Sequence, residues 1–453
     1  MESYTYQNPE LIAALDIGTT KVCVVVGRKN ILNKIEILGF GKVSSEGVIR
    51  GVVSNIDKTV KAISDAVDLA EKMSHTEIQK LYVGIAGQHI KSIQHQGLLL
   101  RSNAQEEVSQ EDVQKLIDDM HKIALPPGDQ ILHVIPQEFT VDQEEGIHDP
   151  VGMSGARLQS NFHIITGNTS AAQNIQRCIE KAGLIYGGMT LEPLASAESV
   201  LSEDEKEAGV VMVDIGGGTT DVTIYNDGII RYTSVIPLGS NMITKDVKAG
   251  CSTTLEYAEK LKVRFGSALA DEIVDNRIIT IPGLMGREPK EISEKNLAKI
   301  IQARVEEIFE YVMWDIHRSG FENKLDAGIV LTGGGSLLKN IDLLAEYRTG
   351  LASRIGIPTM HLSSQYQDEI KNPMFATSIG LLIEGLKKVK PTERLAMKER
   401  SGTVIDLKED DVPVEAFVEH EERVPSKGWL SQTMERSLST LKNFFEDHPD
   451  REF

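Results

Sequence analysis

The chain has 453 residues, enough for roughly two to four domains of ordinary size with a sizeable core. Its 48 basic and 67 acidic side chains give a formal charge of −19, which argues against a nucleic-acid-binding protein, because such proteins present a basic face. The 3 cysteines lie far apart and form no Cys-X-X-Cys pair, which excludes a disulfide framework and a cysteine-based zinc site and fits a reducing cytosol.

Short apolar runs and helical periodicities alternate along the chain and predict an α/β protein. Before residue 87 the expected elements are strands at 11–15, 22–26 and 81–86 and a helix at 56–73. Alternating segments, one amphipathic helix and proline-containing loops fill residues 87–161, which indicates a small α+β insertion. The later expected elements are strands at 162–167, 189–193 and 328–332, a strand–turn–strand unit at 210–225, and helices at 170–184, 194–201, 253–265, 293–318 and 372–386.

The C-terminal part of the sequence differs in composition from the rest. Residues 391–427 are acidic and lack periodicity, which predicts a solvated linker. At about 100° per residue, the apolar side chains of the segment that follows fall on one face of a helix, with basic residues opposite. That face contains Leu430, Met434, Leu438, Leu441, Phe444 and Phe445, and Trp429 lies just outside it as the seventh predicted membrane-contacting residue.

This C-terminal pattern is typical of a helix that lies in a bilayer interface. Docking on the protein's own core or in a partner's groove are the alternatives, whereas the run is too short for a coiled coil. No stretch of about 20 apolar residues could cross a membrane, and the polar first ten residues lack the pattern of a secretion signal. We therefore expect a cytoplasmic protein that contacts a membrane through its C-terminal segment.

Two glycine-containing turns have the same layout, an apolar strand followed by Asp-Ile-Gly and then Thr-Thr and a second strand. They are Asp16–Val22 and Asp214–Val222, and their likeness suggests a duplicated domain. Glycines let backbone N–H groups approach phosphate oxygens, the aspartates can hold magnesium through its waters, and Lys21 supplies a cation. The alternative is that each turn is a plain hairpin, although two matching copies make this less attractive.

A third glycine turn, Leu331–Ser336, lies where a strand is expected to pass into a helix, and its bare backbone can accept a nucleoside at close range. The sequence has no P-loop, no complete Gly-X-Gly-X-X-Gly, no Gly-X-Ser-X-Gly and no His-Glu-X-X-His, which argues against protease, dehydrogenase and zinc enzymes.

These three turns, in this order, resemble those of the actin, Hsp70 and sugar-kinase superfamily. Within it, residues 11–390 resemble the FtsA family of bacterial cell division proteins, through Glu192–Ser196, Ala258–Lys262, His163–Gly167, the mid-chain insertion and the terminal amphipathic helix. The resemblance implies an actin-like α/β fold, in which duplicated ribonuclease-H-type domains surround an ATP cleft and carry an inserted small α+β subdomain.

The resemblance also implies domain boundaries and site residues. The first actin-like domain would comprise residues 1–87 and 163–200, with the insertion at 88–162. The second domain would comprise 201–255 and 325–371, with a small FtsZ-binding subdomain at 256–324. A core helix at 372–390 would return to the first domain, followed by the linker at 391–427 and the membrane helix and tail at 428–453. ATP and magnesium would contact Asp16, Gly18, Thr19, Thr20, Lys21, Asp214, Gly216, Gly217, Gly218, Thr219, Glu259, Lys262, Gly333, Gly334, Gly335 and Ser336, with Asp16 and Asp214 holding the metal.

Hydrolysis of ATP requires a positioned water and a proton acceptor. Glu192 occupies the place where chaperone relatives carry a glutamate near the γ-phosphate, so it is the candidate, and a purely structural carboxylate before Pro193 is an equal alternative. Any turnover is expected to be slow.

The resemblance implies an adaptor that binds ATP and magnesium, polymerises with itself, and ties FtsZ filaments to the cytoplasmic face of the inner membrane at the division site. It would also recruit later division proteins. Two alternatives stay open from the sequence, an actin-like ATP-binding adaptor of pilus assembly and a small-molecule kinase of the same superfamily.

Overall fold

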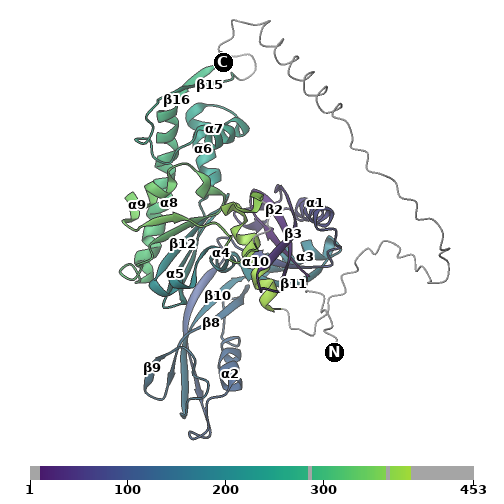
Figure 1. The fold of residues 1–453 in the computed structure, drawn as a ribbon, viewed down its shortest axis with the longest axis vertical. Helices are drawn as coiled ribbons and strands as arrows, with labels where there is room; N and C mark the ends of the chain where they lie inside the picture. The colour runs from purple at the N-terminus through teal and green to yellow at the C-terminus, as the bar shows by residue number, and fades with distance from the viewer. Residues whose placement is uncertain (1–10, 284–287, 364–367, 389–453) are drawn as a thin grey trace, which may run out of the picture. The chain divides into compact units, whose positions relative to one another are not determined.

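The computed structural model describes residues 11–283, 288–363 and 368–388 (Figure 1). The predicted linker at 391–427 and the amphipathic helix with its seven named apolar residues lie outside these residues. Within the described ranges, no helix has the length and apolar character needed to cross a membrane.

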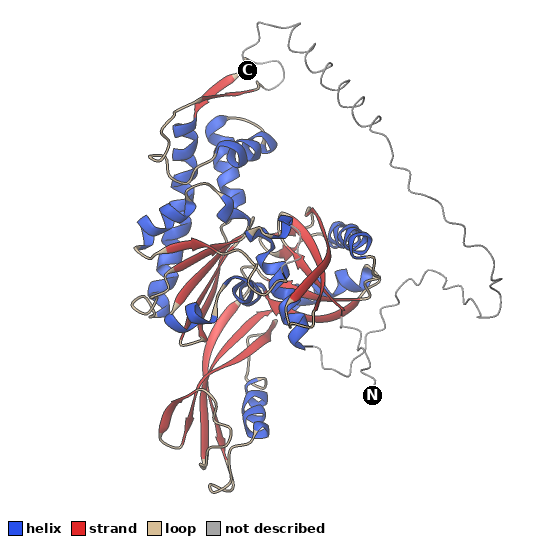
Figure 2. Ribbon diagram, in the orientation of Figure 1, coloured by secondary structure: helices blue, strands red, loops and turns tan. Residues whose placement is uncertain are grey.

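The first half of the fold is built on a five-stranded sheet in the order β11-β6-β1-β2-β3 (red in Figure 2). Its strands are β1 (Leu11–Ile17), β2 (Lys21–Lys29), β3 (Ile35–Ser44), β6 (Lys80–Ile85) and β11 (Ile185–Leu191). β2 is antiparallel to both β1 and β3, whereas β6 and β11 run parallel to β1. The short strands β4 (Val48–Ile49) and β5 (Val52–Val53) form a separate pair.

Helices cover both faces of this sheet because its strands alternate apolar side chains toward each side. α1 (Ile56–Ser74) and α3 (Thr169–Lys181) bury one face, and α10 (Ala376–Lys388) buries the other. α1 approaches β3 so closely that a Cβ on Gly41 would lie 1.9 Å from the carbonyl oxygen of Ala66. Glycine is therefore required at residue 41 for this helix to pack on the sheet.

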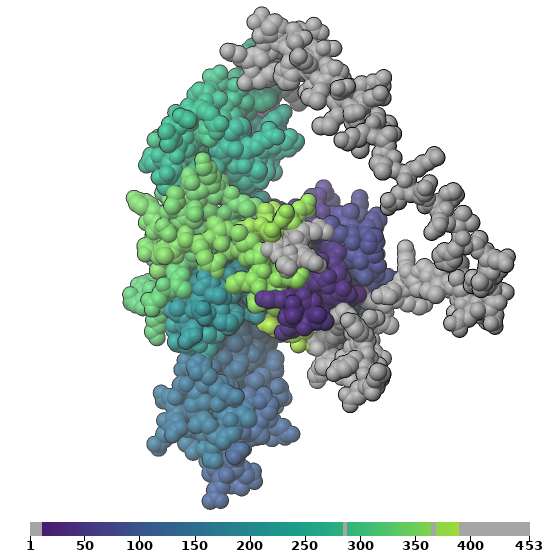
Figure 3. Space-filling model, in the orientation of Figure 1, coloured from purple at the N-terminus to yellow at the C-terminus, as the bar shows by residue number. Residues whose placement is uncertain are grey.

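The predicted insertion forms its own four-stranded antiparallel sheet in the order β7-β10-β8-β9. Its elements are β7 (Lys91–Leu100), α2 (Gln110–Met120), β8 (Asp129–Val141), β9 (Glu144–Ile147) and β10 (Arg157–Asn168). α2 packs on this sheet through Val113, Leu116 and Met120, and these residues form a core separate from the other sheets. In Figure 3 the insertion stands out as a blue lobe.

The second half repeats the first, with a five-stranded sheet in the order β14-β13-β12-β17-β18. Its strands are β12 (Val210–Ile215), β13 (Thr220–Asn226), β14 (Ile229–Ile236), β17 (Ile329–Thr332) and β18 (Ser353–Ile355). Again three antiparallel strands are followed by two parallel ones, so the two sheets share one topology. The duplication predicted from the turns is therefore a duplication of whole sheets.

The remaining elements cover the second sheet or connect the two halves. They are α4 (Glu192–Val200), α5 (Glu203–Ala208), α6 (Ser240–Cys251), α7 (Leu255–Phe265), β15 (Ile278–Ile281), β16 (Lys290–Ser293), α8 (Glu294–Ser319), α9 (Ile341–Thr349) and the 3₁₀ turns Gly334–Leu337, Asp368–Ile370 and Pro373–Phe375. The strand expected at 189–193 is β11, which spans Ile185–Leu191. It ends at Leu191 because α4 already begins at Glu192, with Pro193 in the first turn, where a proline costs no hydrogen bond.

The insertion also touches the second half, through β14. The imidazole of His163 on β10 is buried and lies 3.0 Å from Gln94 Nε2 and 3.3 Å from Thr233 Oγ1 of β14. Gln137 Nε2 donates to the carbonyl of Ile230 at 2.9 Å, and Arg231 binds Glu138 at 2.6 Å. The insertion is therefore held by both halves of the fold.

We expect the His163 contact to make stability sensitive to acid. Burial lowers the pKa of His163 to about 4, so between the unfolded value near 6.5 and 4 the unfolded chain binds the proton first. The stabilisation by neutral His163 is thus present above pH 6.5 and is lost as the pH falls, by about 2 kcal/mol at pH 5. Urea unfolding of His163→Gln at pH 7 and pH 5 should show a correspondingly smaller pH effect. The matched His95→Gln, at an exposed position of β7, should behave as the wild type.

Candidate functional site

The two matching turns lie against each other, one from each half of the fold. In each, the first glycine donates a backbone hydrogen bond across the turn at 2.9 Å, from Gly18 to Lys21 and from Gly216 to Thr219. A Cβ on Gly217 would lie 2.4 Å from Thr20 Cγ2. A Cβ on Gly218 would lie 2.6 Å from the hydroxyl oxygen of Thr19. These two glycines therefore allow the halves to meet, a role that the sequence did not reveal.

The third turn follows β17 and packs behind the second. Gly333 has a φ of +81°, and a Cβ there would lie 2.2 Å from Oδ1 of Asp214. A Cβ on Gly335 would lie 2.3 Å from Ile215 Cγ2, whereas one on Gly334 would meet nothing nearer than 4.0 Å. The first and third glycines are thus required for packing, and the second leaves its side of the turn open.

The three turns surround one cavity of about 580 Å³, a size common for sites that bind small molecules. The predicted residues that line it are Asp16, Gly18, Thr19, Thr20, Lys21, Glu192, Asp214, Gly216, Gly217, Gly218, Thr219, Glu259, Lys262, Gly333, Gly334 and Gly335. Ser336 is not among them. It is buried, and its hydroxyl donates to the carbonyl of Gly333 at 2.8 Å, so it supports the third turn from behind.

Both aspartates of the paired turns are buried and held by hydroxyl groups. Ser378 of α10 donates to Asp16 at 3.0 Å, and Lys21 forms an ion pair with the same carboxylate. Burial disfavours the charged form of Lys21, but the Asp16 carboxylate outweighs it and the pKa of Lys21 is raised. Lys21 therefore stays cationic at the edge of the cavity.

Asp214 accepts hydrogen bonds from Ser196 at 2.7 Å and Thr377 at 3.2 Å. These hydroxyls come from α4 and α10, the two helices that pack together between the sheets. In each aspartate these partners all bind the same oxygen, Oδ2, which keeps Oδ1 available to the cavity.

The structure adds Asp221 to the site, which the sequence analysis did not single out. Asp221 lies opposite Asp214 in the β12–β13 pair, lines the cavity, and its buried Oδ1 has no hydrogen-bond partner. Burial and then the Asp214 carboxylate raise the pKa of Asp221 well above its usual range. The sequence does contain a signal for Asp221, because a four-residue turn at 216–219 pairs residue 214 with residue 221 in the two flanking strands.

Glu192 begins α4 and reaches the cavity over β6. A Cβ on Gly84 would lie 2.7 Å from Glu192 Cγ, so glycine at this position makes room for the glutamate. Burial, and then the carboxylates of Asp16 and Asp221, raise the pKa of Glu192 well above its usual range. A carboxyl group with a raised pKa can exchange a proton near neutral pH.

The other end of the cavity is formed by α6 and α7 together with apolar residues. Lys262 Nζ lies 2.9 Å from Glu259 Oε2 and donates to the hydroxyl of Thr244 at 2.9 Å, so this cation and carboxylate form one fixed polar group. Ile243, Leu337, Leu338 and Met374 provide apolar lining. The cavity thus combines a polar turn region with a mixed apolar region.

The donor set fits a magnesium nucleotide. Turn backbones and Lys21 suit phosphate oxygens, and the unpartnered Asp221 oxygen indicates a place for a donor or a hydrated cation. The described residues contain no group of three or more histidine, cysteine or acidic side chains placed to hold a metal ion. Magnesium usually keeps several waters and uses one or two carboxylates with substrate phosphates, so the two carboxylates of Asp16 and Asp214 would be enough to hold it.

The profile of Cell division protein FtsA matches residues 211–380, and that of the SHS2 domain inserted in FTSA matches residues 87–166. The chain is 38% identical over 408 residues to Cell division protein FtsA of Pseudomonas aeruginosa, covering 90% of this chain and 96% of that one. It is 42% identical over 400 residues to the protein of the same name from Neisseria meningitidis, covering 87% and 96%.

Among solved structures, the PilM-PilN type IV pilus biogenesis complex is similar with a TM-score of 0.62 at 14% identity, covering 83% of this chain and 98% of that one. At this identity the likeness concerns the fold alone. The predicted actin-like α/β fold with an inserted small domain is confirmed by this neighbour and by the match to the inserted SHS2 domain.

Proposed function

Because the chain belongs to the FtsA family of cell division proteins, we propose that it is an ATP-binding adaptor that tethers FtsZ filaments to the cytoplasmic membrane of a dividing bacterium. The protein polymerises with itself and recruits later division proteins. It acts on the cytoplasmic face of the membrane at the division site. The observation that carries ATP binding is the convergence of three glycine turns on one cavity.

In this proposal the triphosphate lies between the paired turns. Residues 18–21 and 216–219 donate to phosphate oxygens, Lys21 neutralises charge, and Asp16 and Asp214 hold magnesium through its waters. The nucleoside contacts Glu259, Lys262 and the open side of the third turn at Gly334. Magnesium, when bound, would offset charge on the phosphates.

Glu192 is the proposed group that accepts a proton from the attacking water. We expect Glu192→Gln to lower the rate of ATP hydrolysis about 100-fold while ATP affinity stays unchanged, since general-base catalysis contributes on this order. Phosphate release and binding of a fluorescent ATP analogue measure the two quantities. Gly84→Ala, which displaces the Glu192 side chain, should lower the rate of ATP hydrolysis in the same way. Unchanged ATP hydrolysis in Glu192→Gln would show that Glu192 has only a structural role.

The membrane part of the proposal rests on the sequence of residues 428–453. One short amphipathic helix binds weakly, but many helices on one polymer bind strongly through effective concentration. The subdomain at 256–324 presents the proposed FtsZ-binding surface. Self-assembly would thus convert a weak tether into a firm scaffold.

The test of this function is co-sedimentation with anionic vesicles, with and without FtsZ and ATP. We expect the full chain to bring FtsZ to vesicles, and removal of residues 428–453 to abolish vesicle binding while ATP binding survives. Vesicle binding that is unchanged by the deletion would contradict the tether. Neither a pilus-assembly adaptor nor a small-molecule kinase is expected to have such a helix. Phosphorylation of common sugars with ATP is the outcome that would favour the kinase.

A further inference from the structure

The loop between β2 and β3 exposes two adjacent aliphatic side chains, which we call the apolar tip. Ile31 is 94% exposed and Leu32 75% exposed, although β2 itself is almost entirely buried. Single exposed aliphatic residues are common on protein surfaces and require no explanation. Three further features of this loop point to a particular partner.

The first feature is that the backbone of the tip is held in place. Oδ1 of Asn30 accepts hydrogen bonds from the amides of Leu32 at 2.9 Å and Lys34 at 3.0 Å. Asn30 and Lys34 also bond through their backbones at 2.8 Å, and Asn33 adopts the left-handed conformation with φ of 59°. The backbone of the loop is therefore already ordered, and little of its conformational entropy is lost when Ile31 and Leu32 contact a partner.

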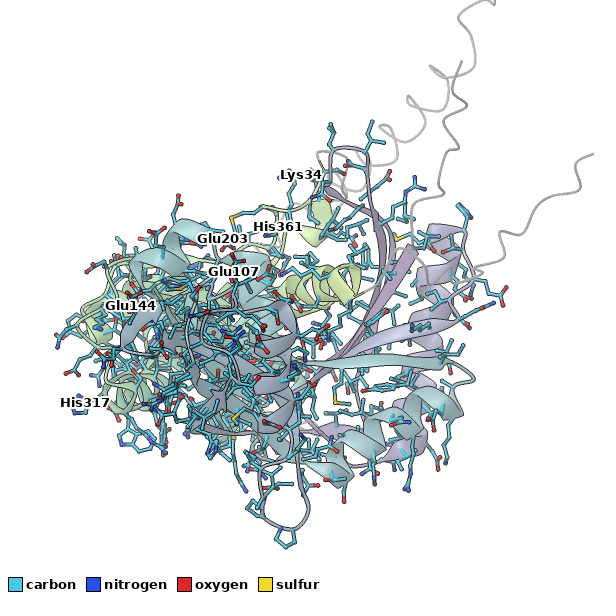
Figure 4. The ribbon with its side chains drawn as sticks, turned by 90° about the horizontal axis from the view of Figure 1, so that it is seen from below. Lys34, Glu107, Glu144, Glu203, His317 and His361 are labelled. Carbon is cyan, nitrogen blue, oxygen red and sulfur yellow. The ribbon has the colours of Figure 1, made fainter. Side chains whose placement is uncertain are left out.

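The second feature is charge. Residues 28–34 contain three bases, Arg28, Lys29 and Lys34, and no acid, in a chain with a net charge of −19. Arg28 pairs with Glu36 at 2.8 Å, and Lys34 Nζ donates to the carbonyl of Met360 at 3.1 Å, which places its cation beside the loop. Figure 4 shows Lys34 and His361 close together at this margin. Aliphatic side chains flanked by cations suit the surface of an anionic bilayer.

The third feature is position. Ile12 of β1 pairs with Gly27 of β2, and a Cβ on Gly27 would lie 2.7 Å from Leu382 of α10, while one on Gly385 would lie 2.8 Å from Ile12. The C-terminal end of α10 therefore packs at the same end of the sheet as the apolar tip. From there the chain continues into residues 389–453, which contain the predicted membrane helix.

We propose that the apolar tip inserts Ile31 and Leu32 into an anionic lipid bilayer as a second membrane contact. This inference rests on the proposed tether function, and it adds what a helix on a long linker cannot provide. A contact through the rigid tip, in addition to the helix, restricts the orientation of the body on the membrane. It also strengthens binding, because the tip is held near the lipid once the helix is bound.

An environment-sensitive fluorophore on the full chain tests insertion directly. The native cysteines, Cys23, Cys178 and Cys251, are all buried, so a label can be directed to Ile31→Cys. Val274→Cys is the matched control, because Val274 is 93% exposed but belongs to the proposed FtsZ-binding subdomain. With vesicles of phosphatidylglycerol and phosphatidylethanolamine, we expect a blue shift and increased emission at residue 31 and no change at residue 274.

The outcomes separate the tip from the tether. If the chain sediments with vesicles but the label at residue 31 stays in water, the tip proposal is wrong and the tether stands. If the chain does not bind vesicles, both are wrong.

A second measurement uses the variant Ile31→Ser/Leu32→Ser in the full chain. Loss of the two aliphatic side chains should weaken vesicle binding at least about five-fold, because burial of even part of each side chain contributes that much. ATP binding serves as the control for folding and should stay as in the wild type, as should vesicle binding of Val274→Ser. Unchanged vesicle affinity of the double variant would overturn the inference.

Discussion

Replacing Gly333 with alanine should strongly weaken ATP binding. Its φ of +81° and ψ of 172° lie in a region adopted essentially by glycine alone and cost an alanine about 1–3 kcal/mol, and the new Cβ would lie 2.2 Å from Oδ1 of Asp214. The Asp214 carboxylate must then move away from its bonds to Ser196 and Thr377, and the proposed magnesium site is lost with it. We expect affinity for magnesium ATP to fall at least about 100-fold, which corresponds to about 2.7 kcal/mol, measured by titration of a fluorescent analogue.

Gly328→Ala provides the control at the other end of β17. Gly328 has a φ of +75°, and a Cβ there would lie 2.1 Å from the carbonyl oxygen of Ala352, so its positive φ and the distance of its clash are similar to those of Gly333. This variant should lose stability in urea unfolding and yet bind ATP with wild-type affinity when folded. Equal loss of ATP binding in both variants would show that strain alone, and not Asp214, explains the effect.

The second large effect is expected for Lys21→Met. Removal of one member of a buried ion pair leaves the other charge uncompensated and costs about 3–5 kcal/mol. The Asp16 side chain is only 5% exposed. Of the two side chains that bind its carboxylate in the described structure, Lys21 and Ser378, only Ser378 would remain. We therefore expect about 3 kcal/mol of lost stability in urea unfolding and at least about 100-fold weaker ATP binding, since the cation proposed to bind the phosphates is removed.

The double variant Asp16→Asn/Lys21→Met separates stability from function. Asparagine removes the uncompensated charge and can keep the hydrogen bond to Ser378, so most of the lost stability should return. ATP binding should not return, because both the Lys21 cation and one of the two carboxylates proposed to hold magnesium are absent. Wild-type ATP affinity in Lys21→Met would mean that Lys21 serves only to neutralise Asp16.

The parts of the fold that follow from local chemistry were predictable. The two turns were recognisable because Asp-Ile-Gly between apolar strands has a clear composition, and their repetition indicated the duplicated halves. The insertion was recognisable by its change of pattern between residues 87 and 161. Of the residues predicted to bind nucleotide and metal or to act in hydrolysis, which all lie in the described ranges, only Ser336 lies outside the cavity lining. The chain after Gly333 turns as a short 3₁₀ helix that directs this side chain inward.

The contacts between distant segments were not predictable from one sequence. Gly217 and Gly218 were assigned to phosphate approach, but their missing Cβ atoms also allow contact with Thr20 and Thr19 of the other half. The attachment of the insertion to β14 depends on His163 and Thr233, which belong to different sheets. Asp221 was visible in the second turn, but its lack of a partner appears only when the surrounding side chains are placed.

The central claim is that the two matching turns hold one triphosphate between them. The most direct measurement is an experimental structure of the full chain with magnesium and a non-hydrolysable ATP analogue. The account predicts one nucleotide with its phosphates between residues 18–21 and 216–219 and its nucleoside beside Gly334, Glu259 and Lys262. A nucleotide bound elsewhere, or phosphates that contact only one of the two turns, would contradict it.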